Sequence, residues 1–399
     1  MAIVKLAEVC EKIGSGATPR GGKEAYCDEG ISLVRSQNVL DFNFSKEGLA
    51  FINDEQAKKL SNVEVHSGDV LLNITGDSVA RACLMDDDYL PARVNQHVAI
   101  IRGNSHKIMN GYVLYYLQWR KEYLLQLASA GATRNALTKA MIEQLELDLP
   151  PLDSQQQIVA ILDSLQSKIQ LNQKTNDNLM QQAVTIFKSW FVEYSPFDGI
   201  EPKEWETVNL EKITALICRG IAPKYSNNSN QTVINQKCIR DHMIDLSQAR
   251  THTPKVINEK WLRFGDLLIN STGDGTLGRT AQVWFQPQNI TVDSHVTIVR
   301  PAKENLIFYI GLWGILHERE IECLHTGSTG QTELPKERVK ALELHLPDNG
   351  TLDRFNTLIA PMAAAIVSKQ NENNKLATLR DALLPKLMSG EIDVSAVQL

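Results

Sequence analysis

The sequence predicts an α+β protein built by tandem duplication, with two α/β globules separated by a pair of long antiparallel coiled-coil helices. Three observations predict this fold class. Short motifs recur in the same order half a chain apart. Two long stretches carry apolar residues at heptad spacing, which is typical of a coiled coil. The 399 residues, 43% of them hydrophobic, suffice for roughly two to four packed domains.

The repeat has three well-matched segments, which occur in the same order in both halves of the chain. Because there are only two long copies, we expect a duplication and not a solenoid of short units. The matched segments are Gly68–Asp77 with Gly265–Asp274, Val94–Arg102 with Val292–Arg300, and Leu145–Pro150 with Leu342–Pro347.

Each copy divides into a globule and a helix, at 1–150 and 151–196 in the first copy and at 197–347 and 348–399 in the second. Short β-rich runs at 70–75, 98–102, 267–270 and 296–300 stand between Gly, Asn, Asp and Pro clusters, which favour turns. A helical stretch over 111–130, with a weaker counterpart at 305–324, completes each α+β globule.

The two helices share one heptad seam, in which the steps alternate between four and three residues. Polar residues enter both seams at the same layers, where buried polar groups cost stability but fix the register. The seam positions are Ile158, Leu162, Leu165, Ile169, Asn172, Asn176 and Leu179 in the first helix, and Phe355, Ile359, Met362, Ile366, Lys369, Asn373 and Leu376 in the second.

The connection between the helices predicts their direction. The chain leaves the first helix, builds the second globule and starts the second helix from it. An antiparallel pair with one globule at each end satisfies this path and gives a dumbbell with pseudo-twofold symmetry. A helix of about 33 residues spans roughly 50 Å, which bounds the separation of the globules. The alternative is two ordinary amphipathic helices, each packed on its own globule.

Composition excludes several classes of protein. No apolar run approaches the roughly 18 residues of a membrane span, and the first residues lack the pattern of a signal peptide. The six cysteines are scattered without zinc-ligand spacing, so we expect reduced thiols in a cytoplasmic protein. A net charge of −6 argues against binding polyanions through the overall field, although it leaves room for local patches.

No motif for catalysis, metal binding or cofactor binding stands out. The segment Gly273–Thr280 approaches a P-loop, but Arg279 replaces its lysine and a strand-like run follows where a helix should begin. We therefore expect no catalytic residue and no metal site in this chain. The duplicated His97 and His295 each stand at the mouth of an apolar strand, and we interpret them as structural histidines.

Longer motifs resemble a known family across the whole chain. Leu147–Asp163 and Leu379–Ile392 are similar to the central and C-terminal signatures of the specificity (S) subunit of Type I restriction-modification enzymes. The Gly-Asp runs that begin at Gly68 and Gly265 resemble the strand-and-turn run of each target recognition domain in that family, and Ser15–Pro19 resembles its opening loop.

This resemblance implies a non-catalytic, sequence-specific DNA-binding subunit of a restriction system in which DNA methylation is the modification. Each target recognition domain would read one half of a bipartite site in double-stranded DNA. The helix pair would set the spacing and dock two methyltransferase (M) subunits, and restriction (R) subunits would complete an ATP-dependent endonuclease. Cofactors are expected in these partners: S-adenosylmethionine for adenine methylation in the M subunits, ATP and Mg²⁺ in the R subunits, and none in this chain.

Candidate DNA contacts are polar residues in the Gly-rich loops of both globules. Arg and Lys bind guanine O6 and N7 or phosphate, and Asn and Gln read adenine. The candidates are Arg20, Lys23, Arg35, Gln37, Asn38, Arg81, Arg93, Arg134 and Asn135 in the first globule, and Arg219, Lys224, Gln236, Lys237, Arg240, Arg279 and Gln331 in the second.

Two other hypotheses come from different functional classes. The first is a coiled-coil scaffold whose globules bind proteins and never DNA. The second is a P-loop nucleotidase. This hypothesis requires that the chain bind ATP detectably and that Arg279→Ala abolish the binding.

Overall fold

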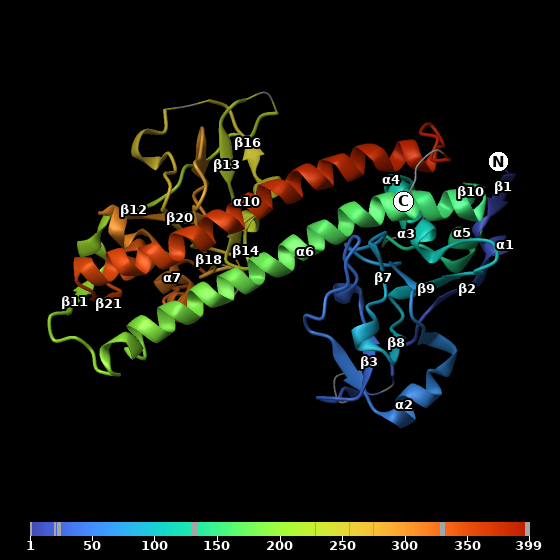
Figure 1. Cartoon of the computed structure of the whole chain (residues 1–399), viewed down its shortest axis with the longest axis horizontal. Helices are drawn as coiled ribbons and strands as arrows, with labels where there is room; N and C mark the ends of the chain where they lie inside the picture. The colour runs from blue at the N-terminus through green and yellow to red at the C-terminus, as the bar shows by residue number, and fades with distance from the viewer. Residues whose placement is uncertain are drawn as a thin grey trace. The chain divides into compact units, whose positions relative to one another are not determined.

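The computed structural model describes residues 2–19, 21, 25–129, 135–227, 229–254, 256–273, 275–327 and 332–395. The chain forms two compact units, which we call unit 1 (Met1–Gln170 with Asn373–Leu399) and unit 2 (Leu171–Glu372). Unit 1 is thus built from both ends of the chain, which are blue to teal and red in Figure 1. Each unit contains a stretch of both long helices, α6 (Leu152–Phe191) and α10 (Asn349–Met388).

Unit 1 is layered around two sheets. One sheet, in the order β2-β9-β6-β7, is antiparallel throughout. The other, in the order β4-β3-β8-β5, has the parallel pair β3–β8 at its centre. A separate ribbon pairs β1 with β10. The strands are β1 (Ala2–Lys5), β2 (Cys10–Ser15), β3 (Ile31–Val34), β4 (Ala50–Ile52), β5 (Glu64–Val65), β6 (Val70–Asn73), β7 (Ala82–Leu84), β8 (Ala92–Val94), β9 (Val98–Gly103) and β10 (Glu146–Leu149).

Unit 2 repeats this plan. Its antiparallel sheet runs β12-β20-β17-β18, its second sheet β16-β13-β19 again contains a parallel pair, β13–β19, and β11 pairs with β21. A short hairpin, β14–β15, is added. The strands are β11 (Glu206–Asn209), β12 (Thr214–Arg219), β13 (Thr232–Ile234), β14 (Ile239–Arg240), β15 (Met243–Ile244), β16 (Arg250–Thr251), β17 (Leu267–Asn270), β18 (Thr280–Gln282), β19 (Ile290–Val292), β20 (Val296–Pro301) and β21 (Glu343–Leu346).

The inner strands β6 and β17 are buried on both faces of their sheets, which explains their continuous apolar runs. In unit 1 Val70 and Leu72 point into the core formed with the helices, whereas Leu71 between them points into the core formed with the second sheet. Leu267 and Leu268 alternate in the same way in unit 2. The shorter helices are α1 (Leu6–Val9), α2 (Asp54–Lys59), α3 (Asn110–Trp119), α4 (Lys121–Ser129) and α5 (Lys139–Glu143) in unit 1, and α7 (Ile307–Leu316), α8 (Glu318–Cys323) and α9 (Lys336–Lys340) in unit 2.

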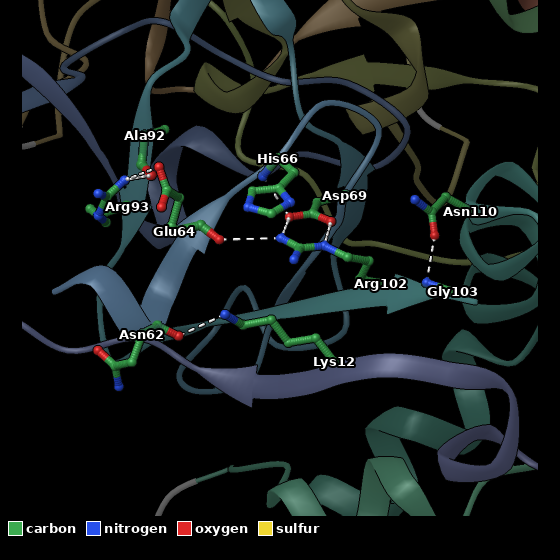
Figure 2. Close-up of polar contacts among 10 residues, drawn as sticks. All are labelled: Lys12, Asn62, Glu64, His66, Asp69, Ala92, Arg93, Arg102, Gly103 and Asn110. Carbon is green, nitrogen blue, oxygen red and sulfur yellow. Dashed lines mark hydrogen bonds and ion pairs between the residues drawn. The ribbon is translucent and has the colours of Figure 1, made fainter. Parts of the chain in front are cut away.

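A buried ion pair explains the Gly-Asp motif of unit 1 (Figure 2). Asp69 accepts two hydrogen bonds of 2.7 Å from the Arg102 guanidinium, one on each carboxylate oxygen. The same carboxylate accepts the backbone N–H of His66 at 2.8 Å, and Gly68 takes a left-handed φ of 74° to close this turn. The pair therefore ties the turn before β6 to the end of β9, because Arg102 lies on β9.

Unit 2 contains the same arrangement in a more buried form. Asp266 accepts 2.8 Å bonds from Nε and Nη2 of Arg300, and its carboxylate also accepts the N–H of Arg263 at 2.8 Å. The side chains of Asp266 and Arg300 are 0% and 8% exposed. Two further guanidinium N–H groups donate to backbone carbonyls of Glu259 and Trp261. Removing one partner of such a pair leaves an uncompensated buried charge, which is strongly destabilising.

The two long helices pack against each other in unit 1. Gln166 on α6 accepts a 2.6 Å hydrogen bond from Arg380 on α10, and the carbonyl of Ile169 accepts one of 3.2 Å from Asn373. Since the residue number falls along α10 as it rises along α6, the helices are antiparallel. Ile158 and Leu162 share a core with Leu384, Leu387 and Met388.

The helices also pack against each other in unit 2, again in antiparallel register. Asn172 donates to the Glu372 carboxylate at 2.8 Å and accepts from Lys369 at 3.4 Å. At the other end of this stretch the ring of Phe355 lies 6.0 Å from Phe187 and 4.8 Å from Phe191, centre to centre. The fourteen predicted seam residues are all buried or half-buried.

The α+β class, the duplication and the antiparallel helix pairing are therefore confirmed, and the alternative of two unpaired helices is wrong in both units. Each helix is longer than expected, at 40 residues. The predicted β runs correspond to β6, β9, β17 and β20, and the helical stretches to α3–α4 and α7–α8.

The two-residue loop of the β14–β15 hairpin in unit 2 forms an ion pair with α8. Asp241 and His242 connect β14 to β15 with left-handed φ values of 52° and 60°. Nδ1 of His242 lies 3.2 Å from the Glu318 carboxylate, which also accepts the Thr280 hydroxyl at 3.0 Å. The bond to Glu318 raises the pKa of His242. Burial opposes ionisation of Glu318, but its bonds from His242 and Thr280 together leave its pKa lowered.

We expect Asp266→Ala to lower the free energy of unfolding of unit 2 by about 3–5 kcal/mol, because it leaves the Arg300 guanidinium buried without its partner. The midpoint of urea unfolding measures this effect. Glu55→Ala, which removes an exposed ion pair with Lys59 on α2, is the matched control and should leave the midpoint nearly unchanged. Equal midpoints for the two variants would contradict the structural role of the buried pair.

We expect the stabilisation from His242 and Glu318 to depend on pH. A raised histidine pKa stabilises the fold below the ordinary value near 6.5, and this gain is lost as the pH rises through the raised value. A lowered carboxyl pKa stabilises the fold above the ordinary value near 4.5, and this gain is lost as the pH falls through the lowered value.

The difference in urea midpoint between the wild type and His242→Asn should therefore be largest between about pH 4.5 and 6.5 and shrink above it. Asparagine is a suitable replacement because it tolerates the left-handed conformation of the hairpin. A difference that stays constant from pH 5 to 9 would show that the ion pair contributes nothing.

Candidate nucleic-acid interface

The loops at the ends of β3, β6 and β8 meet in unit 1 and form a polar surface, which we call loop surface 1. The loop after β6 spans residues 74–81, the turn after β3 is the 3-10 helix Ser36–Asn38, and the turn after β8 spans residues 95–97. They enclose a shallow pocket of about 470 Å³. The pocket is lined by Ser36, Gln37, Thr75, Gly76, Asp77, Ser78, Arg81 and His97.

Buried backbone contacts fix loop surface 1 to the sheet. The Asn73 side chain, at the end of β6, donates to the carbonyls of Ser36 at 2.8 Å and Val39 at 3.2 Å, which joins the loop after β6 to the turn after β3. The N–H of Gly76 donates to the carbonyl of Asn135 at 3.2 Å. Because these groups are buried or bonded, the loop leaves the sheet along a defined path.

An equivalent surface in unit 2, which we call loop surface 2, is formed by the 3-10 helix Gln236–Cys238 after β13, residues 271–273 and 275–279 after β17, and residues 293–295 after β19. The Asn270 side chain donates to the carbonyl of Gln236 at 3.1 Å, as Asn73 does in unit 1. The loop then passes Gly278 at a φ of 86°, where a Cβ would lie 2.8 Å from the Cβ of Glu322. Ala80 holds the matching left-handed position in unit 1, at a φ of 68°. The anchor and the left-handed position are therefore shared, although the loop of unit 2 is one residue longer and the side chains differ.

Several predicted DNA-contact residues lie on these surfaces. Gln37 and Arg81 line the pocket of loop surface 1, and Asn135 is exposed beside it. Arg35 lies at its edge, where its guanidinium donates to the carbonyl of Gly48. On loop surface 2 lie Gln236, Lys237, Arg279 and Arg219, of which Arg219 bonds the carbonyl of Leu334 and forms a 2.8 Å ion pair with Glu333.

Two predicted contacts are buried inside unit 1. The Asn38 side chain is 0% exposed and bonds the backbone of Arg35, Ser45 and Glu47. Arg93, on β8, is 8% exposed and bonds the carbonyls of Ala57 and Ala92, with Glu64 at 3.4 Å (Figure 2). Both side chains brace the second sheet from within and are not presented to a ligand.

The remaining predicted contacts lie elsewhere. Lys224 is exposed in the loop after β12, and Arg240 is exposed on β14, 3.4 Å from Asp241. Arg20, Lys23, Arg134 and Gln331 lie outside the described residues.

Two residues interpreted as structural lie on the loop surfaces. His97 lines the pocket of loop surface 1, and its Nδ1 lies 2.7 Å from the hydroxyl of Thr75. His295 is exposed, and its Nδ1 lies 2.7 Å from the hydroxyl of Thr272. The signal available in the sequence was the duplication itself, since a threonine and a histidine recur together in both copies.

The described residues contain no group of three or more His, Cys, Asp or Glu side chains placed to hold a metal ion. In the same part of the chain, no helix combines the length and the apolar character that crossing a bilayer requires.

The loop surfaces stand on a fold that is already known. The structure is similar to the crystal structure of the S subunit of a Type I restriction-modification system from M. genitalium, with a TM-score of 0.56, 12% sequence identity, and coverage of 97% of this chain and 96% of that one. The two proteins thus share a fold.

Sequence comparisons agree with the fold. Residues 1–181 match the family model of the Type I restriction modification DNA specificity domain. The MjaIX specificity subunit of Methanocaldococcus jannaschii is 26% identical, over 98% of this chain and 93% of the relative. The HindI specificity subunit of Haemophilus influenzae is 21% identical, over 91% and 94%. The chain is therefore similar over nearly its whole length to specificity subunits of Type I restriction enzymes.

Proposed function

We propose that this chain is the non-catalytic specificity subunit of a Type I restriction-modification complex and that each unit reads one half of a bipartite DNA site. The observation that carries the proposal is the presence of one polar loop surface in each unit, on the same buried anchors, Asn73 and Asn270. A protein with two such surfaces can contact two separated half-sites, as dimeric DNA-binding proteins do.

The two loop surfaces carry different side chains at positions suited to reading bases, as recognition of two different half-sites requires. Backbone pairing aligns Val34 with Ile234, so Gln37 in unit 1 corresponds to Lys237 in unit 2. Nε2 of Gln37 donates to the carbonyl of Gly48 at 3.1 Å, which leaves its Oε1 to accept from the amino group of a base. Lysine instead donates to guanine O6 or N7. The two units are thus suited to different bases.

The helix pair supplies the second part of the proposed function. Its antiparallel contacts in both units support a role in setting the spacing between the half-sites. Leu171, Leu358 and Leu379 remain 59%, 44% and 47% exposed on the helices. Single exposed apolar side chains are common on protein surfaces, so these leucines do not by themselves mark an interface. We assign the docking of two M subunits to the helix pair on the likeness to specificity subunits, with R subunits joining the complex.

The chemistry of the complex is assigned to the partner subunits. S-adenosylmethionine would act in the M subunits, which methylate adenine, and ATP and Mg²⁺ would act in the R subunits. This chain would contribute recognition alone, in the cytoplasm, where the DNA is found.

The proposal is tested by co-expressing the chain with its M subunit and sequencing the methylated genome. We expect methylation at one split motif that disappears when the chain is omitted. A contiguous motif, or methylation that does not depend on the chain, would overturn the proposal and favour a protein-binding scaffold.

We expect Gln37→Ala and Lys237→Ala to relax the motif in opposite halves. Each lost base contact should reduce discrimination at one position by about 1–3 kcal/mol, roughly 5- to 150-fold. The motif from the same methylation assay measures the change, and each variant serves as the control for the other. If both variants altered the same half, the assignment of one half-site to each unit would be wrong.

We expect the gap between the half-sites to follow the length of the helix pair. Inserting seven residues into α6 at the Asn172–Asn176 layer and seven into α10 at the Lys369–Asn373 layer should lengthen the spacer by about 10 Å, or about 3 base pairs. A variant in which the same heptads are replaced without insertion is the control. An unchanged gap would show that the helices do not set the spacing.

A further inference from the structure

Some positions on the two loop surfaces carry the same side chain. The N–H of Asn73 bonds the carbonyl of Arg81 at 2.8 Å, and the N–H of Asn270 bonds the carbonyl of Arg279 at 2.9 Å, so the two arginines are equivalent. The carbonyls of His97 and His295 likewise accept the N–H of the residue that follows each asparagine, at 3.0 and 2.8 Å. An arginine and a histidine therefore stand at matching places in both units.

Each histidine is held in one orientation. The backbone N–H of His97 donates to the Asn95 side chain at 3.0 Å, and its ring is fixed through Nδ1 by Thr75. His295 is held in the same way by Asp293, at 2.9 Å, and by Thr272. When the threonine hydroxyl donates to Nδ1, the ring hydrogen lies on Nε2, so that nitrogen is a donor without a positive charge. In unit 1 the side-chain amide nitrogen of Gln96 lies 3.3 Å from Nε2 of His97, so Gln96 must turn away before this nitrogen donates to a phosphate. The threonines are positioning residues for this donor.

In unit 1 the arginine lies on the same surface as the histidine, and the matching backbone bonds extend this placement to unit 2. Arg81 and His97 line one pocket in unit 1. In unit 2 the Arg279 guanidinium donates to the carbonyl of Gly275 at 2.8 Å through Nη2, which orients it and leaves its other N–H groups available. A guanidinium beside a second N–H donor is a good ligand for a phosphate oxygen.

The ligand follows from what the two half-sites have in common. Different half-sites present different base edges, whereas the phosphodiester backbone is the same everywhere. Side chains that differ between the units, such as Gln37 and Lys237, suit base reading. Side chains that are identical in the two units suit contacts with the phosphodiester backbone of DNA.

We propose that Arg81 with His97, and Arg279 with His295, each bind a DNA phosphate and so fix one unit on its half-site. This inference rests on the proposed function, because it takes DNA as the ligand of both loop surfaces. Asp77 lines the pocket of loop surface 1 and opposes the phosphate electrostatically.

The test uses the full chain in complex with its M subunits and a duplex that carries its methylated motif. Affinity is measured by fluorescence anisotropy over a range of KCl concentrations. We expect Arg81→Ala and Arg279→Ala each to weaken binding about tenfold and to reduce the slope of log affinity against log salt by about 0.9, with the motif unchanged. Lys58→Ala, which removes one positive charge from α2, is the control and should change neither quantity.

Two further sets of variants separate this role from a general loss of structure. Asp77→Asn should strengthen binding, because it removes the repulsion and keeps the shape of the side chain. His97→Phe and Thr75→Val should weaken binding several-fold. His97→Gln, whose amide can replace Nε2–H, and Thr75→Ser, which keeps the hydroxyl, should restore it.

The outcomes distinguish this inference from the function on which it rests. If the wild-type complex binds no split motif, the proposed function fails. If the wild type binds but the arginine variants keep its affinity and salt slope, or alter the bases recognised in one half, the phosphate assignment is wrong while the recognition function stands.

Discussion

A buried carboxylate bonded to a guanidinium and to a backbone N–H is the constraint on which each recognition unit depends. Asp69 and Asp266 each occupy the turn that starts the central strand of the antiparallel sheet, and Arg102 and Arg300 hold that turn against the neighbouring strand. The ion pair fixes the residue at which β6 or β17 begins and so the position of its other end. The loop surfaces lie at those other ends. The Gly-Asp motif thus supports recognition from the far end of the strand.

The same logic separates constant from variable parts of the molecule. The side chains of Asn73 and Asn270 fix the loops to the sheet. Each donates to a backbone carbonyl in the turn after β3 in unit 1 or after β13 in unit 2. Beyond these anchors the side chains diverge, as at Gln37 and Lys237. A frame that does not depend on the exposed side chains allows those side chains to change without loss of the fold, which suits a protein whose task is to discriminate between DNA sequences.

Much of the fold could be predicted because its signals are local or duplicated. The heptad seam and the repeated Gly-Asp run indicate the helix pair and the central strands. The parallel pairing of β3 with β8 could not be predicted, since it joins segments about sixty residues apart with no turn signal between them. The candidate site suffered from the same limit. In the sequence Arg93 looks like a surface arginine, whereas in the structure it is buried against Glu64 and the carbonyl of Ala57. In the sequence His97 looks like a structural residue, whereas in the structure it lines the pocket and contacts Thr75.

Unit 1 is discontinuous, and this has a consequence for biosynthesis. Its core includes Leu384, Leu387 and Met388 from the end of α10, packed with Leu162 from α6. During translation the core of unit 1 cannot be completed until this part of α10 has left the ribosome, whereas unit 2 needs no residue beyond Glu372. Until then the apolar residues of α6 that Leu384, Leu387 and Met388 cover stay exposed to solvent.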